Sequence, residues 1–293
     1  MTDPRTDPTT DPRTVQLPDT PYRGKLIAVG TRHGKQHQFA PAFRSVLGAD
    51  LLTPPGLDTD RFGTFTGEVP RQGAAIEAAR AKARLAMDAT GLPYGLASEA
   101  SYGVVPGGWF GHEEIVVFCD EALGIEVAVG HRSSFVPGTV HRVSRTADLP
   151  DHLVAGLPGQ ALTVRPCGIV AAGIKGVTDI DTLNSAITAA VAASPERLAL
   201  VEPDLRAHHN PSRRQVLRRL AASLADRLAT GCPACGAPGF GRVAAEPGLP
   251  CRFCETPTDQ VRNEIHACAS CPHRVSLPVA GAADPAGCPS CNP

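Results

Sequence analysis

Eight of the ten cysteines lie in the last third of this 293-residue chain, where they form four Cys-x-x-Cys pairs. Each pair can present two thiolates from one tight turn, and zinc binds four thiolates in a tetrahedron. Redox-active dithiols do not occur as four evenly spaced pairs, which favours zinc over an iron–sulfur cluster or catalytic thiols. We therefore predict two zinc ions, bound by Cys232, Cys235, Cys251, Cys254, Cys268, Cys271, Cys288 and Cys291.

The spacing of the four pairs suggests how they combine. Fifteen residues separate Cys235 from Cys251, and sixteen separate Cys271 from Cys288. This near-equal spacing predicts tandem zinc ribbons, in which the first four cysteines bind one ion and the last four bind the other. Interleaved pairs would also satisfy both ions, so the spacing leaves that alternative open. Four thiolates leave no open coordination position, and a structural role follows.

A second group of residues follows a predicted strand over residues 25–29. The turn Gly30-Thr-Arg-His-Gly-Lys35 contains small residues that let a phosphate approach the backbone, and Lys35 supplies a positive charge. We predict that Thr31, His33 and Lys35 bind a phosphorylated ligand. A generic surface turn would explain the same residues equally well.

Further polar residues follow later predicted elements. Glu99 comes directly after a predicted strand over residues 94–97, where a carboxylate could hold a metal ion or activate water. A simple strand-end cap is the alternative. Arg206, His208 and Arg213 gather positive charge around the start of a predicted helix whose N-cap is Asn210. We predict that these three residues also contact the substrate.

The order of predicted elements indicates the domain organisation. Residues 1–22 repeat a Thr-Asp-Pro theme without apolar periodicity, which predicts a disordered tail. Alternating strands and helices predict an α/β domain over residues 23–230, followed by a zinc-ribbon region over residues 231–293. We expect helices over 36–47, 73–90, 181–193 and 211–229, and strands over 25–29, 50–53, 94–97, 114–119, 125–129, 161–165 and 198–202.

Composition narrows the range of partners. The 28 basic and 29 acidic residues nearly cancel, so no global field attracts nucleic acid or an anionic membrane. The chain has no apolar run of about 18 residues and its first residues lack a signal-peptide core, which predicts a cytoplasmic protein without membrane contact. The cysteine region is also close to charge balance, with Phe240 and Phe253 as its only aromatic residues. This composition favours contact with a protein partner, or a purely structural role in holding the fold together, over nucleic-acid binding.

The order of motifs resembles the N-terminal half of the inosine-triphosphate pyrophosphatase superfamily, which includes the Maf-like pyrophosphatases. The similar stretch covers residues 25–103: the turn at residues 30–35, the series Gly73-x3-Glu77-x4-Lys82-Ala-Arg, and Leu96-Ala-Ser-Glu99. The resemblance implies a mixed sheet with flanking helices, two α/β lobes and a cleft between them. It also implies magnesium-dependent hydrolysis of a nucleoside triphosphate.

Catalytic roles come from this resemblance position by position. Lys35 corresponds to the phosphate-binding lysine and Glu77 to a metal-binding glutamate. Glu99 stands where the superfamily carries paired acids, so Asp58 or Asp60 would complete the magnesium site. The family's Ser-His-Arg signature is absent, and the stretch from Arg206 to Arg213 replaces it. The catalytic residues implied are Glu99, Glu77 and Lys35, and the magnesium ligands are Glu77, Asp58 and Asp60.

The whole chain also resembles a bacterial family with a cysteine-rich tail, described as a domain of unknown function. Three functions are therefore expected in order of preference. The first is a magnesium-dependent hydrolase acting on a nucleoside triphosphate or a related phosphorylated small molecule. The second is a nucleotide sensor whose zinc ribbons contact a protein partner, and the third is a nucleic-acid-binding zinc-ribbon protein.

Overall fold

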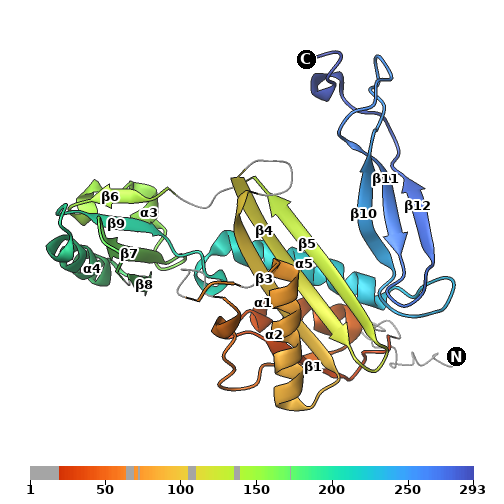
Figure 1. The fold of residues 1–293 in the computed structure, drawn as a ribbon, viewed down its shortest axis with the longest axis horizontal. Helices are drawn as coiled ribbons and strands as arrows, with labels where there is room; N and C mark the ends of the chain where they lie inside the picture. The colour runs from red at the N-terminus through yellow and green to blue at the C-terminus, as the bar shows by residue number, and fades with distance from the viewer. Residues whose placement is uncertain (1–19, 64–68, 72, 105–109, 135–138, 172) are drawn as a thin grey trace, which may run out of the picture.

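The computed structural model describes residues 20–63, 69–71, 73–104, 110–134, 139–171 and 173–293. The chain forms three parts, which we name the main lobe, the small lobe and the cysteine arm (Figure 1). The main lobe consists of the described residues within 20–133 and 211–229. The small lobe, residues 141–203, is inserted between the last strand and the last helix of the main lobe, and the cysteine arm is residues 231–293.

The main lobe contains a five-stranded mixed sheet in the order β2-β1-β3-β4-β5. Its strands are β1 (Leu26–Gly30), β2 (Asp50–Leu52), β3 (Tyr94–Val104), β4 (Phe110–Asp120) and β5 (Ile125–Ser133). The first of these pairs in parallel with its neighbours β2 and β3, whereas β3, β4 and β5 are antiparallel. The predicted mixed α/β architecture is confirmed.

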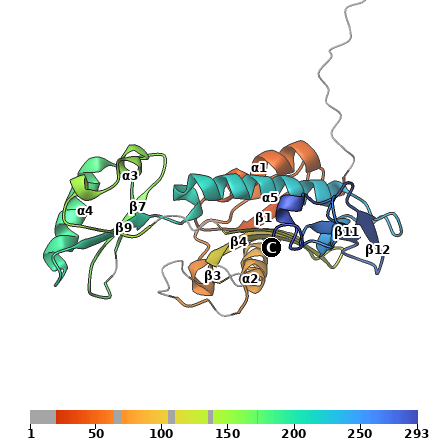
Figure 2. The same cartoon turned by 90° about the horizontal axis from the view of Figure 1, so that it is seen from above.

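Helices cover both faces of this sheet (Figure 2). Helices α1 (Gln36–Ala42) and α5 (Pro211–Ala229), with the π-helical segment η1 (Phe43–Leu47), pack on one face. Helix α2 (Ala75–Thr90) packs on the other through its alanines. The approach is close, because a Cβ atom on Gly30 would lie 2.1 Å from the carbonyl oxygen of Lys82. Glycine at the end of β1 thus lets α2 lie directly against the strand.

The small lobe has a four-stranded antiparallel sheet in the order β6-β9-β7-β8. Two helices pack against it around a separate core of leucine, isoleucine and valine side chains. This lobe is composed of β6 (His141–Val143), α3 (Asp151–Ala155), β7 (Leu162–Pro166), β8 (Ile174–Val177), α4 (Ile180–Ala193) and β9 (Ala199–Pro203).

The cysteine arm projects from the end of α5 as an antiparallel three-stranded sheet (Figure 1). Its strands are β10 (Gly241–Pro247), β11 (Val261–Ala267) and β12 (Arg274–Pro278). Arg227 fixes the base of the arm to the main lobe, since its guanidinium donates to the carbonyl oxygens of Gly239 and Ala128, both at 3.0 Å.

Two details differ from the sequence-based expectations, and one expectation falls on residues that the structure does not describe. Tyr22, placed in the tail by sequence, is buried in the main core and its hydroxyl donates to Asp120. Strand β3 continues through Val104, so Ser98 and Glu99 lie within the strand and not after its end. Residues 1–19 of the predicted tail lie outside the described residues, as do residues 64–68. Among the described residues, no helix is long and apolar enough to cross a membrane.

Candidate functional site: an interlobe pocket and two four-cysteine groups

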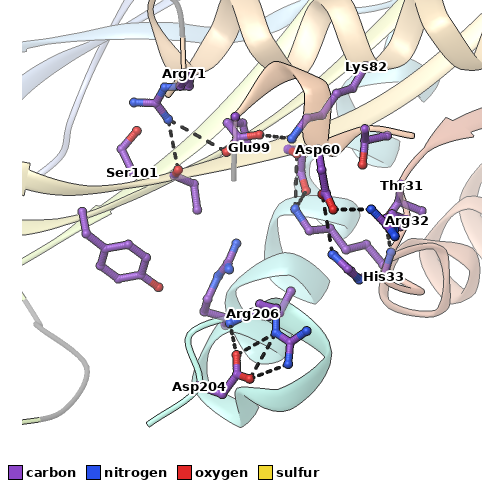
Figure 3. Close-up of a pocket in the computed structure, with 18 of the residues that line it drawn as sticks. Thr31, Arg32, His33, Asp60, Arg71, Lys82, Glu99, Ser101, Asp204 and Arg206 are labelled. Atoms are coloured by element: carbon purple, nitrogen blue, oxygen red, sulfur yellow. Dashed lines mark hydrogen bonds and ion pairs between the residues drawn. The ribbon is translucent and has the colours of Figure 1, made fainter. Parts of the chain in front are cut away.

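A pocket of about 530 Å³ lies at the carboxyl end of β1, between the main lobe and the small lobe. Strand β1 is flanked by β2 on one side and β3 on the other, and the connecting helices α1 and α2 lie on opposite faces. Open α/β sheets bind ligands at such a switch point, where neighbouring connections diverge. We call this cavity the interlobe pocket (Figure 3).

Positive charge is concentrated in the interlobe pocket. Seven arginine or lysine residues line it against four aspartate or glutamate residues, whereas the whole chain has a net charge of −1. Three of the four lysines of the sequence are among them. The cationic residues are Arg32, Lys35, Arg71, Lys82, Lys175, Arg206 and Arg213, and the acidic residues are Asp60, Glu99, Glu202 and Asp204.

Lys35 has no carboxylate partner within ion-pair distance among the described residues. Its ammonium donates to the hydroxyl of Ser98 at 3.0 Å and to the carbonyl oxygen of the same residue at 3.3 Å. Burial lowers the pKa of Lys35 to about 8, although the carboxylates of Glu114 and Glu99 favour its charged form. A partly buried ammonium held only by neutral oxygens can accept an anionic ligand without first breaking an ion pair.

Glu99 also lines the pocket, but a cation already engages its carboxylate. Lys82 Nζ lies 2.5 Å from one oxygen, and Arg71 Nη1 lies 3.9 Å from the other. The lysine comes from α2 and is itself buried. A water-activating role for Glu99 would require this ion pair to loosen, because the ammonium of Lys82 occupies a carboxylate oxygen that would otherwise accept a proton from water.

The predicted magnesium ligands do not converge in the structure. The Asp60 carboxylate reaches the interlobe pocket, where it accepts a hydrogen bond from Arg32 at 2.6 Å. Asp58 accepts from the backbone amide of Asp60 and lies 3.7 Å from Arg32. Glu77 is exposed and caps its own helix by accepting from the Ala74 amide at 2.9 Å. It is not among the residues that line the pocket.

The predicted basic residues beside α5 are brought to the pocket in part. Arg206 and Arg213 line it, and both are held by carboxylates: Arg206 by Asp204 at 2.7–3.1 Å, and Arg213 by Glu114 at 2.8–3.0 Å. Burial would raise the pKa of the Asp204 carboxyl, but Arg206 holds it below its ordinary value. These arginines therefore contribute fixed positive charge to the pocket wall. Their guanidinium groups already donate to carboxylates, so they are less free to bind a ligand.

Histidines form the wall next to Asp60. The His33 ring lines the pocket and stacks on the His208 ring, with centroids 4.9 Å apart. His208 lies behind it against His209, and its Nδ1 atom is buried without a hydrogen-bond partner among the described residues. Burial lowers the pKa of His208 to about 4, reinforced by the neighbouring histidines. This wall is therefore neutral at physiological pH.

Sequence reasoning overlooked several residues that line the interlobe pocket. The structure brings seven of the predicted residues together there: Thr31, His33, Lys35, Asp60, Glu99, Arg206 and Arg213. One clue was present, because lysine is rare in this chain and Lys82 and Lys175 both belong to the pocket. The overlooked charged residues are Arg71, Lys82, Lys175, Glu202 and Asp204.

The eight cysteines of the arm form two groups, but not the groups that the spacing predicted. Within each group, the ligand atoms lie within 4.8 Å of one another. The predicted sequential pairing is wrong: the first and third pairs meet, and the second and fourth pairs meet. The groups are Cys232, Cys235, Cys268 and Cys271, and Cys251, Cys254, Cys288 and Cys291.

The antiparallel sheet of the arm explains this interleaving. Strand β10 leads away from the first pair and β11 returns, so the third pair arrives beside the first. Strand β12 then leads back to the far end, where the fourth pair meets the second. The two groups consequently occupy opposite ends of one sheet, and the first group lies at the base of the arm beside α5.

The sulfur positions fit zinc. In the first group, Cys232 Sγ lies 3.8 Å from Cys271 Sγ, and Cys235 Sγ lies 3.7 Å from Cys268 Sγ. In the second group the cross-pair distances are 3.9, 3.6 and 3.3 Å. A tetrahedron with zinc–sulfur bonds of about 2.3 Å places sulfurs about 3.8 Å apart. All eight thiols are free of disulfide bonds.

Comparison with known families finds one matching family model. A family described as a domain of unknown function, DUF6671, matches residues 82–293. The chain belongs to the DUF6671 family. The match begins at Lys82 and includes Glu99, Arg213 and the whole cysteine arm, whereas the β1 turn with Lys35 precedes it. No curated protein and no solved structure matches the chain, so the resemblance to inosine-triphosphate pyrophosphatases stays a prediction.

Proposed function

We propose that this DUF6671 member binds a phosphorylated small molecule, with a nucleotide as the best candidate, in the interlobe pocket. The observation that carries the proposal is Lys35, an ammonium inside the pocket whose partners are neutral oxygens of Ser98. Phosphate oxygens would give this charge the partner that the described residues do not supply. The pocket volume of about 530 Å³ is within the range of small-molecule sites.

Hydrolysis of the bound ligand with magnesium is the first candidate activity. It is favoured by Glu99 and Asp60, two carboxylates that line the same pocket as the cations. A magnesium ion bound together with the phosphates would compete with Lys82 and Arg32 for these carboxylates, and it would stabilise negative charge on the phosphoryl oxygens. The carboxylate of Glu99, freed from Lys82, would then orient water.

Sensing without hydrolysis is the second candidate. It is favoured by the ion pair between Lys82 and Glu99, in which the ammonium offsets the charge of the carboxylate. It is also favoured by the placement of Glu77 outside the pocket. In this candidate the two zinc-bearing ends of the arm are structural, and the arm carries the nucleotide signal to a protein partner.

Binding is tested by titrating ATP, ITP and tripolyphosphate calorimetrically into the full chain with and without magnesium. Lys35→Ala is expected to weaken all three ligands about 10- to 100-fold, the effect of losing a charge-assisted contact. Lys25→Ala is the matched control, because Lys25 is exposed and is the one lysine of the chain outside the pocket. Equal binding by both variants, or no binding by the wild type, would overturn the proposal.

Release of phosphate and pyrophosphate by the same proteins separates the two candidates. Hydrolysis requires turnover that Glu99→Gln abolishes while nucleotide affinity is kept. Sensing predicts nucleotide binding without product release by any variant or by the wild type.

A further inference from the structure

A second cavity, which we call the side pocket, adjoins the interlobe pocket. It has a volume of about 540 Å³ and lies at the carboxyl ends of β1 and β2. Thr31 and Arg32 line both cavities, so the two cavities are direct neighbours on either side of these residues. The functions discussed above do not use the side pocket.

The side pocket differs from its neighbour in charge. Its charged residues are Arg32 and Asp58, whose side chains lie 3.7 Å apart and offset each other. Much of the remaining wall is Pro54, Pro55 and Leu57. Prolines and leucine offer an apolar surface on which a flat ring can lie.

Two residues that line the side pocket each have a buried side-chain oxygen without a hydrogen-bond partner among the described residues. These oxygens are Gln36 Oε1 and Thr53 Oγ1. The Gln36 amide nitrogen lies 3.4 Å from the His37 ring, which leaves Oε1 as its unused group. Buried polar atoms are normally paired, and an unpaired one loses the hydrogen bonds it made to water. A ligand with N–H groups at its edge would satisfy both oxygens.

We propose that the side pocket binds the heterocyclic base of the nucleotide whose phosphates occupy the interlobe pocket. The base is the part of a nucleotide that is uncharged, planar and edged with hydrogen-bond donors, as this cavity requires. Strand β1 then ends between the two halves of the ligand, with Lys35 facing the phosphates and Thr53 facing the base. The inference rests on the proposed function and adds the element of specificity that a bare phosphate site lacks.

The test compares nucleoside triphosphates with tripolyphosphate, which has the phosphates but no base. Thr53→Val and Gln36→Met each remove one hydrogen-bonding group with little change in size. We expect each to weaken the preferred triphosphate among ATP, GTP, CTP and ITP by about three- to tenfold and to leave tripolyphosphate affinity unchanged. Thr188→Val, at an exposed position on α4, is the matched control and should change neither.

The outcomes separate this inference from the function it rests on. If the wild type binds neither tripolyphosphate nor nucleotide, the phosphate site itself is wrong. If tripolyphosphate binds as tightly as every nucleotide and the side-pocket variants change nothing, the phosphate site stands and the base site is refuted. Equal weakening of nucleotide and tripolyphosphate in Thr53→Val and Gln36→Met would also refute it, because the effect would not concern the base.

Discussion

Arg213 and Glu114 form a buried bidentate ion pair that joins the start of α5 to β4. Arg213 Nε donates to one carboxylate oxygen at 2.9 Å, and Nη2 donates to the other at 3.0 Å. Burial alone would raise the pKa of the Glu114 carboxyl, but the Arg213 charge holds it below its ordinary value. The pair joins two segments of the main lobe that are 99 positions apart in the sequence, with the inserted small lobe between them.

Breaking this pair should destabilise the protein strongly. Glu114→Gln leaves the Arg213 guanidinium buried without its charged partner, and we expect the free energy of unfolding to fall by about 3–5 kcal/mol. Urea denaturation followed by circular dichroism measures it. Glu113→Gln on the same strand is the control, because its partner Arg132 is largely exposed and such pairs contribute about 1 kcal/mol or less. Similar losses in the two variants would contradict the buried-pair explanation.

The interleaved cysteine groups can be checked by counting metal. The double variant Cys251→Ser and Cys288→Ser removes two ligands from one group and should leave one zinc per chain. Cys232→Ser and Cys251→Ser removes one ligand from each group and should weaken both sites. Elemental analysis after dialysis against a mild chelator measures the difference. Sequential pairing would reverse these two results, and metal-free wild type would refute the zinc assignment.

Anion binding should depend on the protonation of Lys35. Its pKa is lowered to about 8 by burial, so the free pocket loses a positive charge as the pH rises through 8. We expect tripolyphosphate affinity to fall between pH 7 and pH 9.5, measured by calorimetry. Lys35→Arg should flatten this fall, because a guanidinium stays charged throughout the range. The titration of tripolyphosphate itself affects the wild type and the variant equally, so it cancels in the comparison. Parallel pH profiles of tripolyphosphate affinity in the two proteins would refute the role of Lys35.

The histidine wall should make the fold sensitive to acid. The pKa of His208 is about 4 in the folded chain and about 6.5 when unfolded. Between these values the unfolded chain takes up a proton that the folded chain does not, so acidification lowers stability.

The stability lost through His208 should disappear in His208→Gln. We expect the wild type to lose more unfolding free energy than the variant as the pH falls from 7 to 4, measured by urea denaturation. Loss of metal at acid pH affects both proteins and cancels in the difference. Identical pH dependence in the two proteins would show that His208 takes up its proton at the same pH in the folded and the unfolded chain, which would refute the shifted pKa.

Much of the main lobe could be predicted from local sequence. The alanine-rich face of α2, ended by Gly91, is a local pattern that the structure confirms. The start of α5 is another: Asn210 caps it by accepting from the Arg213 amide at 3.0 Å, and Pro211 is its first residue. These signals concern neighbours in the chain, where spacing fixes geometry.

The pocket was predictable in part. Lys35 could be identified from the β1 turn, but the ion pair of Lys82 with Glu99 depends on how α2 lies across β3. Lys175 reaches the pocket from the small lobe, whose orientation no local pattern encodes. The cysteine pairing failed for a related reason, since spacers of 15 and 16 residues fit either arrangement and the sheet order decides between them.

The interleaved arm also limits how such a protein can change during evolution. Tandem ribbons can be gained or lost one at a time, because each holds its own four ligands on a continuous stretch. Here a deletion anywhere between Cys235 and Cys268 that removes the second pair also alters the strands connecting the first pair to the third. The two cysteine groups are therefore expected to be inherited together, as a single unit of about 60 residues.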